Sequence, residues 1–142
     1  MSYFLDRALS IEKARHRFLN HGDKMNIQLN DVINLMPEVI FYKDLNGLYQ
    51  GGNLAWAELI GKPVSQMIGK SDLDIFPKES AEIYHNNDLK MLAMKQETRN
   101  QEWIEYPDGR RILVETQKTP IRNKDGEIIG LFGICRPLIK AG

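Results

Sequence analysis

Three histidines and one cysteine are the first candidates for catalytic or metal-binding chemistry in this chain of 142 residues. The histidines, His16, His21 and His85, lack the close mutual spacing of a metal-ligand set. Neither a Gly-x-Ser-x-Gly nucleophile motif nor a phosphate-binding glycine loop followed by Lys-Ser or Lys-Thr is present. Gly51-Gly52 precedes an expected helix, but two adjacent glycines are more typical of a tight turn than of a phosphate site. We therefore predict no catalytic and no metal site, and we expect that the domain is not an enzyme.

The overall charge limits the classes of partner. Lys plus Arg number 19 and Asp plus Glu number 19, so no net field attracts nucleic acid or an anionic membrane. We therefore expect no nucleic-acid partner. The sequence contains no run of about 18 apolar residues, so it predicts no membrane span. Its single cysteine cannot form an internal disulfide. These features predict a cytoplasmic location, either as a separate protein or as the cytoplasmic portion of a larger membrane-associated one.

The first 24 residues have the pattern of an amphipathic helix. Apolar side chains recur at helical spacing between basic residues, and His21-Gly22-Asp23 is typical of a helix end. A shorter helix is expected at 27–36, where Pro37 ends it. The apolar stripe would pack either on its own domain or on a second subunit. We favour a homodimer, because the rest of the chain accounts for a complete small domain. The candidate dimer contacts are Phe4, Leu5, Leu9, Ile11, Phe18 and Leu19.

From residue 38 the pattern changes to short strands and short helices. β-branched and aromatic runs predict strands at 39–42, 48–50, 98–106, 110–119 and 127–136, with turns at 44–47, 106–109 and 123–126. Helical turns are predicted at 53–60, 64–68 and 71–74, and a long helix at 77–95. Because strands and helices do not alternate, we predict an α+β fold with a five-stranded antiparallel sheet and short helices on one face. The expected units are a helix at 1–24, a domain at 25–137 and a tail at 138–142.

Several motifs appear in an order that resembles the PAS domain, a sensory module of bacterial signal-transduction proteins. The resemblance runs from Asp31 to Arg136 and is similar in particular to the PAS domains of hybrid sensor histidine kinases. The motifs are Met36-Pro37, 41–47 (FYKDLNG), Asn53, 59–61 (LIG), 68–72 (IGKSD), Phe76-Pro77, 106–109 (YPDG), Asp125-Gly126, Gly130 and Gly133.

This resemblance implies a sensor or interaction module that transmits a signal to an effector. Haem-binding members take an axial histidine from the long helix, which makes His85 a candidate, although its polar neighbours favour a solvated side chain. Light-sensing members form a flavin adduct with a cysteine that would fall near 71–75, where none occurs. Cys135 is more typical of a small core residue. We therefore predict no photoactive flavin.

The resemblance also implies a cavity between the sheet and the long helix. An apolar set would line either a closed core or a pocket for a small ligand: Phe41, Trp56, Met91, Leu92, Trp103, Ile112, Val114, Phe132 and Ile134. Arg110, Arg111 and Lys118 would bind an acid only if they turned inward, and exposed positions are the expectation for all three. A structural adaptor with an empty core is the other possibility.

Overall fold

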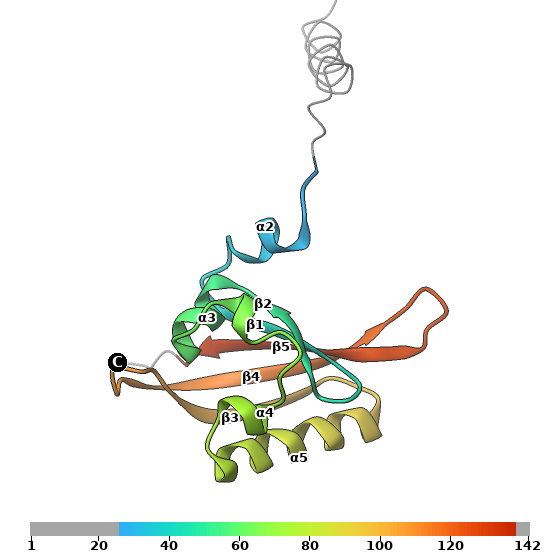
Figure 1. The fold of residues 1–142 in the computed structure, drawn as a ribbon. Helices are drawn as coiled ribbons and strands as arrows, with labels where there is room; N and C mark the ends of the chain where they lie inside the picture. Colours follow the sequence, from blue (N-terminus) through green and yellow to red (C-terminus); the bar gives the residue numbers. More distant parts are fainter. Residues whose placement is uncertain (1–25, 139–142) are drawn as a thin grey trace, which may run out of the picture.

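A five-stranded antiparallel sheet carries helices on its faces in the computed structural model, which describes residues 26–138. The sheet has the order β2-β1-β5-β4-β3, so the first hairpin and the C-terminal strands join through the pairing of β1 with β5 (Figure 1). In chain order the elements are α2 (Leu29–Ile33), β1 (Val39–Asp44), β2 (Tyr49–Gly52), α3 (Leu54–Ile60), η1 (Val64–Gln66), α4 (Asp72–Ile75), α5 (Lys78–Met94), β3 (Thr98–Glu105), β4 (Arg111–Arg122) and β5 (Ile128–Pro137). The predicted α+β class and five-stranded antiparallel sheet are confirmed.

The helix ends follow the local chemistry of the sequence. Ser71 and Asp74 form a capping box at the start of α4, and Pro77 precedes the first turn of α5, where a missing N–H costs nothing. Gly61 ends α3 in the left-handed conformation, at φ 80°. These short-range signals explain why the predicted helices begin and end within a few residues of the observed ones.

The two faces of the sheet bury different clusters. Val39 and Phe41 of β1 point to the face that α3, η1 and α5 cover, where they join Trp56, Met67 and Met91 in the main core. The intervening Ile40 points to the opposite face, where it packs with Ile33 of α2 and Ile134 of β5. We call these the inner and the outer face. In Figure 1, α4 and α5 lie beneath the sheet and α2 lies above it.

Asn53 joins elements from both faces at one fully buried side chain. Its Oδ1 accepts hydrogen bonds from the backbone N–H of Ile40 and of Trp56, each at 3.0 Å. Its Nδ2 donates to the carbonyl oxygens of Ile33 (3.1 Å) and Glu38 (2.7 Å), and at 3.3 Å to that of Met36. The side chain therefore caps α3 and also fixes the chain between α2 and β1.

Replacing Asn53 should strongly destabilise the fold. Asn53→Ala removes a cap and leaves several buried backbone groups without partners, so we expect a loss of about 3 kcal/mol in the free energy of unfolding. Urea denaturation followed by circular dichroism measures it. Asn100→Ala, on an exposed position of β3, is the matched control and should cost less than about 0.5 kcal/mol. Equal losses in the two variants would contradict this role of Asn53.

Candidate ligand-binding site

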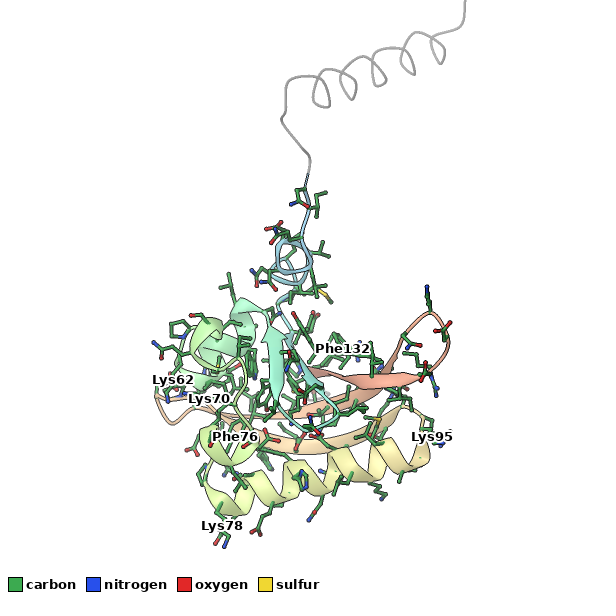
Figure 2. The ribbon with its side chains drawn as sticks, turned by 45° about the vertical axis from the view of Figure 1, so that its right-hand side comes forward. Lys62, Lys70, Phe76, Lys78, Lys95 and Phe132 are labelled. Atoms are coloured by element: carbon green, nitrogen blue, oxygen red, sulfur yellow. The ribbon has the colours of Figure 1, made fainter. Side chains whose placement is uncertain are left out.

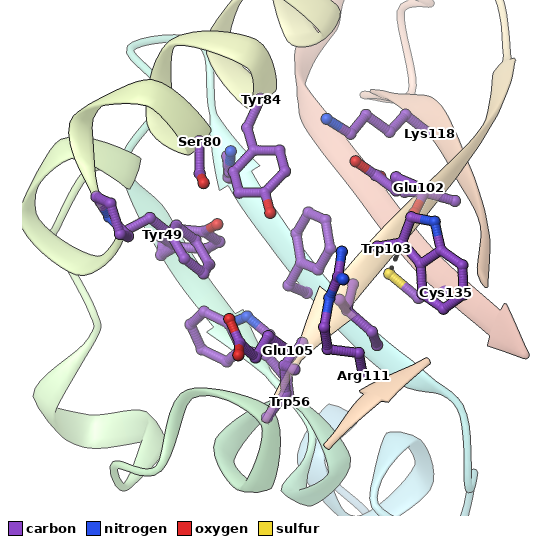
Figure 3. Close-up of a pocket in the computed structure, with 17 residues that line it drawn as sticks. Tyr49, Trp56, Ser80, Tyr84, Glu102, Trp103, Glu105, Arg111, Lys118 and Cys135 are labelled. Atoms are coloured by element: carbon purple, nitrogen blue, oxygen red, sulfur yellow. Dashed lines mark hydrogen bonds between the residues drawn. The ribbon is translucent and has the colours of Figure 1, made fainter. Parts of the chain in front are cut away.

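A cavity of about 300 Å³ lies on the inner face of the sheet (Figure 3). Strands β1 to β5, α3, α5 and the segment before α5 all contribute to its wall. Aromatic rings from β1, β2 and α3 pack together there, and the centroids of Tyr49 and Trp56 are 4.8 Å apart. The lining residues are Phe41, Lys43, Tyr49, Trp56, Leu59, Phe76, Pro77, Ser80, Tyr84, Glu102, Trp103, Ile104, Glu105, Arg111, Thr116, Lys118 and Cys135.

Two lysines of this wall, Lys43 and Lys118, pair with two buried carboxylates, Asp72 and Asp88, that do not themselves line the cavity. We call these four residues the buried quartet. The Nζ of Lys43 is 2.6 Å from Asp72 Oδ2 and 2.7 Å from Asp88 Oδ2. The Nζ of Lys118 is 2.5 Å from Asp88 Oδ1. All four residues are less than 7% exposed. Formally two positive and two negative charges cancel, so the quartet has no net charge.

Tyr49 extends the quartet toward the aromatic rings. Its hydroxyl donates to Asp72 Oδ1 at 2.5 Å, and the Nζ of Lys43 lies 4.7 Å from the centroid of its ring. Burial, followed by the negative charge of Asp72, raises the pKa of Tyr49 well above its usual value. Tyr49 is therefore a neutral donor throughout the physiological range, and both oxygens of Asp72 are occupied.

The buried quartet links strands to helices that are distant in the sequence. Lys43 and Lys118 come from β1 and β4, whereas Asp72 and Asp88 come from α4 and α5. An ammonium group buried without a carboxylate would cost several kcal/mol. Each lysine therefore requires these helices to lie over the inner face, and the contacts position the helices against the sheet.

Seven of the nine predicted pocket residues lie in or around the cavity and divide into three groups. Phe41 and Trp56 line the cavity and are buried. Trp103 borders it from the edge strand β3 but is 51% exposed, with the guanidinium of Arg111 5.1 Å from its ring centroid. The others of the set on this face belong to the surrounding core without reaching the cavity: Met91, Leu92, Ile112 and Val114.

The prediction that Phe132 and Ile134 line the pocket is wrong, because both lie on the outer face of the sheet. Both belong to the outer cluster with Ile40, and Figure 2 shows Phe132 on the side of the sheet opposite α5. Their neighbours Leu131 and Cys135 point inward instead. Alternation along a strand defines two sets of residues but does not say which set faces the helices.

The expectation that Lys118 is exposed is also wrong. It is 3% exposed and lines the cavity. Arg110 and Arg111 are exposed as expected, although Arg111 contributes to the rim. Sequence reasoning missed Lys43, Asp72 and Asp88 as a cluster. The sequence does contain one signal for the burial of Lys43. Lys43 lies two and four residues after Phe41 and Val39 on β1, and alternate residues of a strand point to the same face.

Comparison with known proteins agrees with this geometry. A family model described as "PAS fold" matches residues 33–139. The chain belongs to the PAS family. The PAS domain from Bordetella pertussis BvgS has the same fold, with a TM-score of 0.68, 18% identity and coverage of 79% of this chain and 85% of that chain.

Two further relatives of this PAS domain are signal-transduction proteins. It is 27% identical over 110 residues to the aerobic respiration control sensor protein ArcB of Escherichia coli (strain K12), which covers 78% of this chain and 14% of ArcB. A structure of VqmA bound to DPO has a TM-score of 0.69 and 26% identity, and covers 75% of this chain and 55% of that chain. The chain therefore spans only a part of these proteins. What they share with it is a PAS sensor module.

The expectation of no nucleic-acid partner is overturned. A Vibrio cholerae VqmA structure with a TM-score of 0.71 and 25% identity, covering 81% of this chain and 53% of that chain, is a complex with ligand and DNA. A protein that contains this kind of PAS domain thus has DNA as a partner. Zero net charge on one domain does not describe the surface of a larger protein.

The histidine and cysteine of the PAS domain lie in positions that give them little chemistry. His85 is exposed on α5 and does not line the cavity, which argues against it as a haem ligand. Cys135 lines the cavity at 5% exposure, with its Sγ 3.4 Å from Thr116 Oγ1. Burial raises the pKa of Cys135 to about 11, so the thiol is protonated and a poor nucleophile near neutral pH.

Within the described part of the chain, no group of three His, Cys, Asp or Glu side chains is arranged to hold a metal ion. In the same part, no helix combines the length and the hydropathy that crossing a bilayer requires. The cytoplasmic location stays a prediction.

The candidate dimer residues Phe4, Leu5, Leu9, Ile11, Phe18 and Leu19 lie outside the described residues.

Removing one member of the buried quartet should destabilise the domain far more than removing a surface charge. Lys43→Met leaves Asp72 and Asp88 without their shared cation, so we expect a loss of about 3–5 kcal/mol in the free energy of unfolding. Lys78→Met is the matched control, because Lys78 and Glu82 form an exposed pair at 4.0 Å that is worth less than about 1 kcal/mol. Urea denaturation compares the two, and similar losses would contradict the assigned role of Lys43.

Proposed function

We propose that this PAS domain is the sensor module of a longer bacterial signal-transduction protein and that it binds a small molecule in the cavity beside the buried quartet. The cavity carries the proposal, because it combines packed aromatic rings with the buried ammonium group of Lys118, which has N–H donors without a partner in the described part of the chain. Ligand pockets in proteins are typically apolar with a few well-placed polar groups. The VqmA structures support the proposal, since a relative with 26% identity is bound to DPO.

The buried quartet offers a route from the cavity to the rest of the domain. A ligand that contacts Lys118 changes the surroundings of Asp88, and Asp88 also holds Lys43 of β1. Strand β1 follows α2 directly, and Ile33 of α2 packs on Ile40 of β1. We propose that ligand binding shifts the packing of α2 on the outer face and that an attached effector reads this two-state change.

The outer face is also where we propose that a second copy of the chain docks. Several apolar side chains around α2 are largely exposed, with Leu35 at 83% and Ile27 at 66%. They directly follow the amphipathic pattern of residues 2–20, whose stripe would extend the same apolar surface. A homodimer formed by the N-terminal segment and this face would bring two sensor modules, and two effectors, together.

Native mass spectrometry of freshly purified protein tests ligand binding. We expect a bound small molecule in the wild type and none in Ser80→Trp, because Ser80 lines the cavity at the start of α5 and an indole there fills the space. Ser65→Trp is the matched control, since Ser65 is exposed and away from the cavity. A clean protein mass in the wild type would favour the adaptor with an empty core.

Sedimentation velocity tests the dimer. Deleting residues 1–24 removes the predicted helix, so we expect the dimer of the full chain to become a monomer at micromolar concentration. Deleting residues 138–142 is the control and should leave the dimer intact. A dimer that survives the first deletion unchanged would contradict the role given to the N-terminal segment.

A further inference from the structure

We propose that the cavity selects a small uncharged aromatic compound that carries a hydrogen-bond donor next to an acceptor, such as a single ring with a carboxamide group. The proposal rests on the proposed ligand-binding function of the same cavity and defines the chemical class of the ligand. It follows from the donors, the acceptor and the charge balance at one end of the cavity.

Two groups in the cavity wall, the ammonium of Lys118 and the hydroxyl of Tyr84, can donate hydrogen bonds to a ligand. The ammonium group of Lys118 carries three N–H bonds, and Asp88 Oδ1 takes one of them. Within residues 26–138 its Nζ has no second partner. The Tyr84 hydroxyl also lines the cavity, and burial raises its pKa to about 12, so it remains a donor. A ligand acceptor at this end would therefore receive hydrogen bonds from both groups.

One acceptor lies close to these donors. Glu102 of β3 lines the cavity and is half-buried, and its carboxylate forms no ion pair with any residue in the described part of the chain. After burial, the negative charge of Glu102 is the next cause of the raised pKa of Tyr84. Figure 3 shows Glu102, Lys118 and Tyr84 at one end of the cavity and Trp56 at the other. A ligand donor placed beside the acceptor would meet Glu102.

The charge balance favours a neutral ligand. The buried quartet sums to zero and the lining residues Arg111 and Glu105 cancel each other, so Glu102 leaves the cavity with one formal negative charge. A carboxylate ligand would be repelled by Glu102 and would also lose its hydration on entering the cavity. A zwitterion would bury two further charges. An uncharged donor and acceptor pair satisfies the free groups without either cost.

The size and the walls of the cavity favour a single substituted ring. A cavity of about 150 Å³ is known to hold benzene, and this one is about 300 Å³. The rings of Phe41, Tyr49 and Trp56 lie 4.8 to 6.5 Å apart between centroids, and they offer aromatic faces and edges for stacking. The polar end would then orient the substituent while the rings hold the aromatic body.

Amide NMR titrations of the full chain with three nearly isosteric probes test the ligand class. Benzamide has the donor and the acceptor, acetophenone keeps only the acceptor, and benzoate carries a negative charge. We expect saturable shifts at cavity residues with benzamide, and binding about tenfold weaker for each of the other two, since a hydrogen bond to a charged group is worth about that factor. Equal or tighter binding of benzoate or acetophenone overturns the ligand class and leaves the cavity as a ligand site. No saturable binding of any probe contradicts the proposed function as well.

Variants identify the groups that make the selection. Glu102→Gln removes the charge and keeps the shape, so we expect benzamide to bind about fivefold more weakly and benzoate to bind more tightly. Tyr84→Phe should weaken benzamide and acetophenone alike. Glu115→Gln is the matched control, because Glu115 of β4 points to the opposite face and pairs with Arg99. If Glu102→Gln changes the benzamide affinity no more than Glu115→Gln does, the role of Glu102 is wrong.

Discussion

Two lysines on the buried side of the sheet impose the constraint on which the rest of the structure depends. Lys43 and Lys118 cannot remain charged there without carboxylates, and the only ones that reach them within residues 26–138 come from α4 and α5. The same ion pairs keep these helices over the inner face. Because the lysines also line the cavity, the interactions that position the helices are the ones that a ligand can perturb.

The position of the Phe41 ring, which lines the cavity, depends on a glycine in the central strand. Gly133 of β5 lies between Phe41 of β1 and Lys118 of β4 in the ladder, and a Cβ at this position would lie 2.2 Å from the Phe41 ring. The missing side chain lets the Phe41 ring lie across the strand. The aromatic end and the charged end of the cavity thus share one wall, which allows an amphipathic ligand to contact both.

Local signals predicted the elements well and the site poorly. The cap at Asn53, the capping box at Ser71 and the proline before α5 act over three or four residues, so the sequence shows them directly. The cavity instead unites residues up to 94 positions apart in the chain, from Phe41 to Cys135. Asp88 shows the difference, because it is a charged residue in a polar stretch of α5 and no local signal marks it as buried, yet it is 4% exposed.

The amino-acid sequence by itself determined the fold class, the order of the strands and helices, and the membership of the PAS family, because capping, turn chemistry and alternation are local properties. Each strand has two sets of alternate residues, and only the tertiary structure decided which set faces the helices. That choice buried Lys43 and Lys118 and moved Phe132 and Ile134 to the outer face. The physical reason is that burial and ion pairing depend on the packing of distant elements, and two opposite assignments of the faces have the same pattern along a strand.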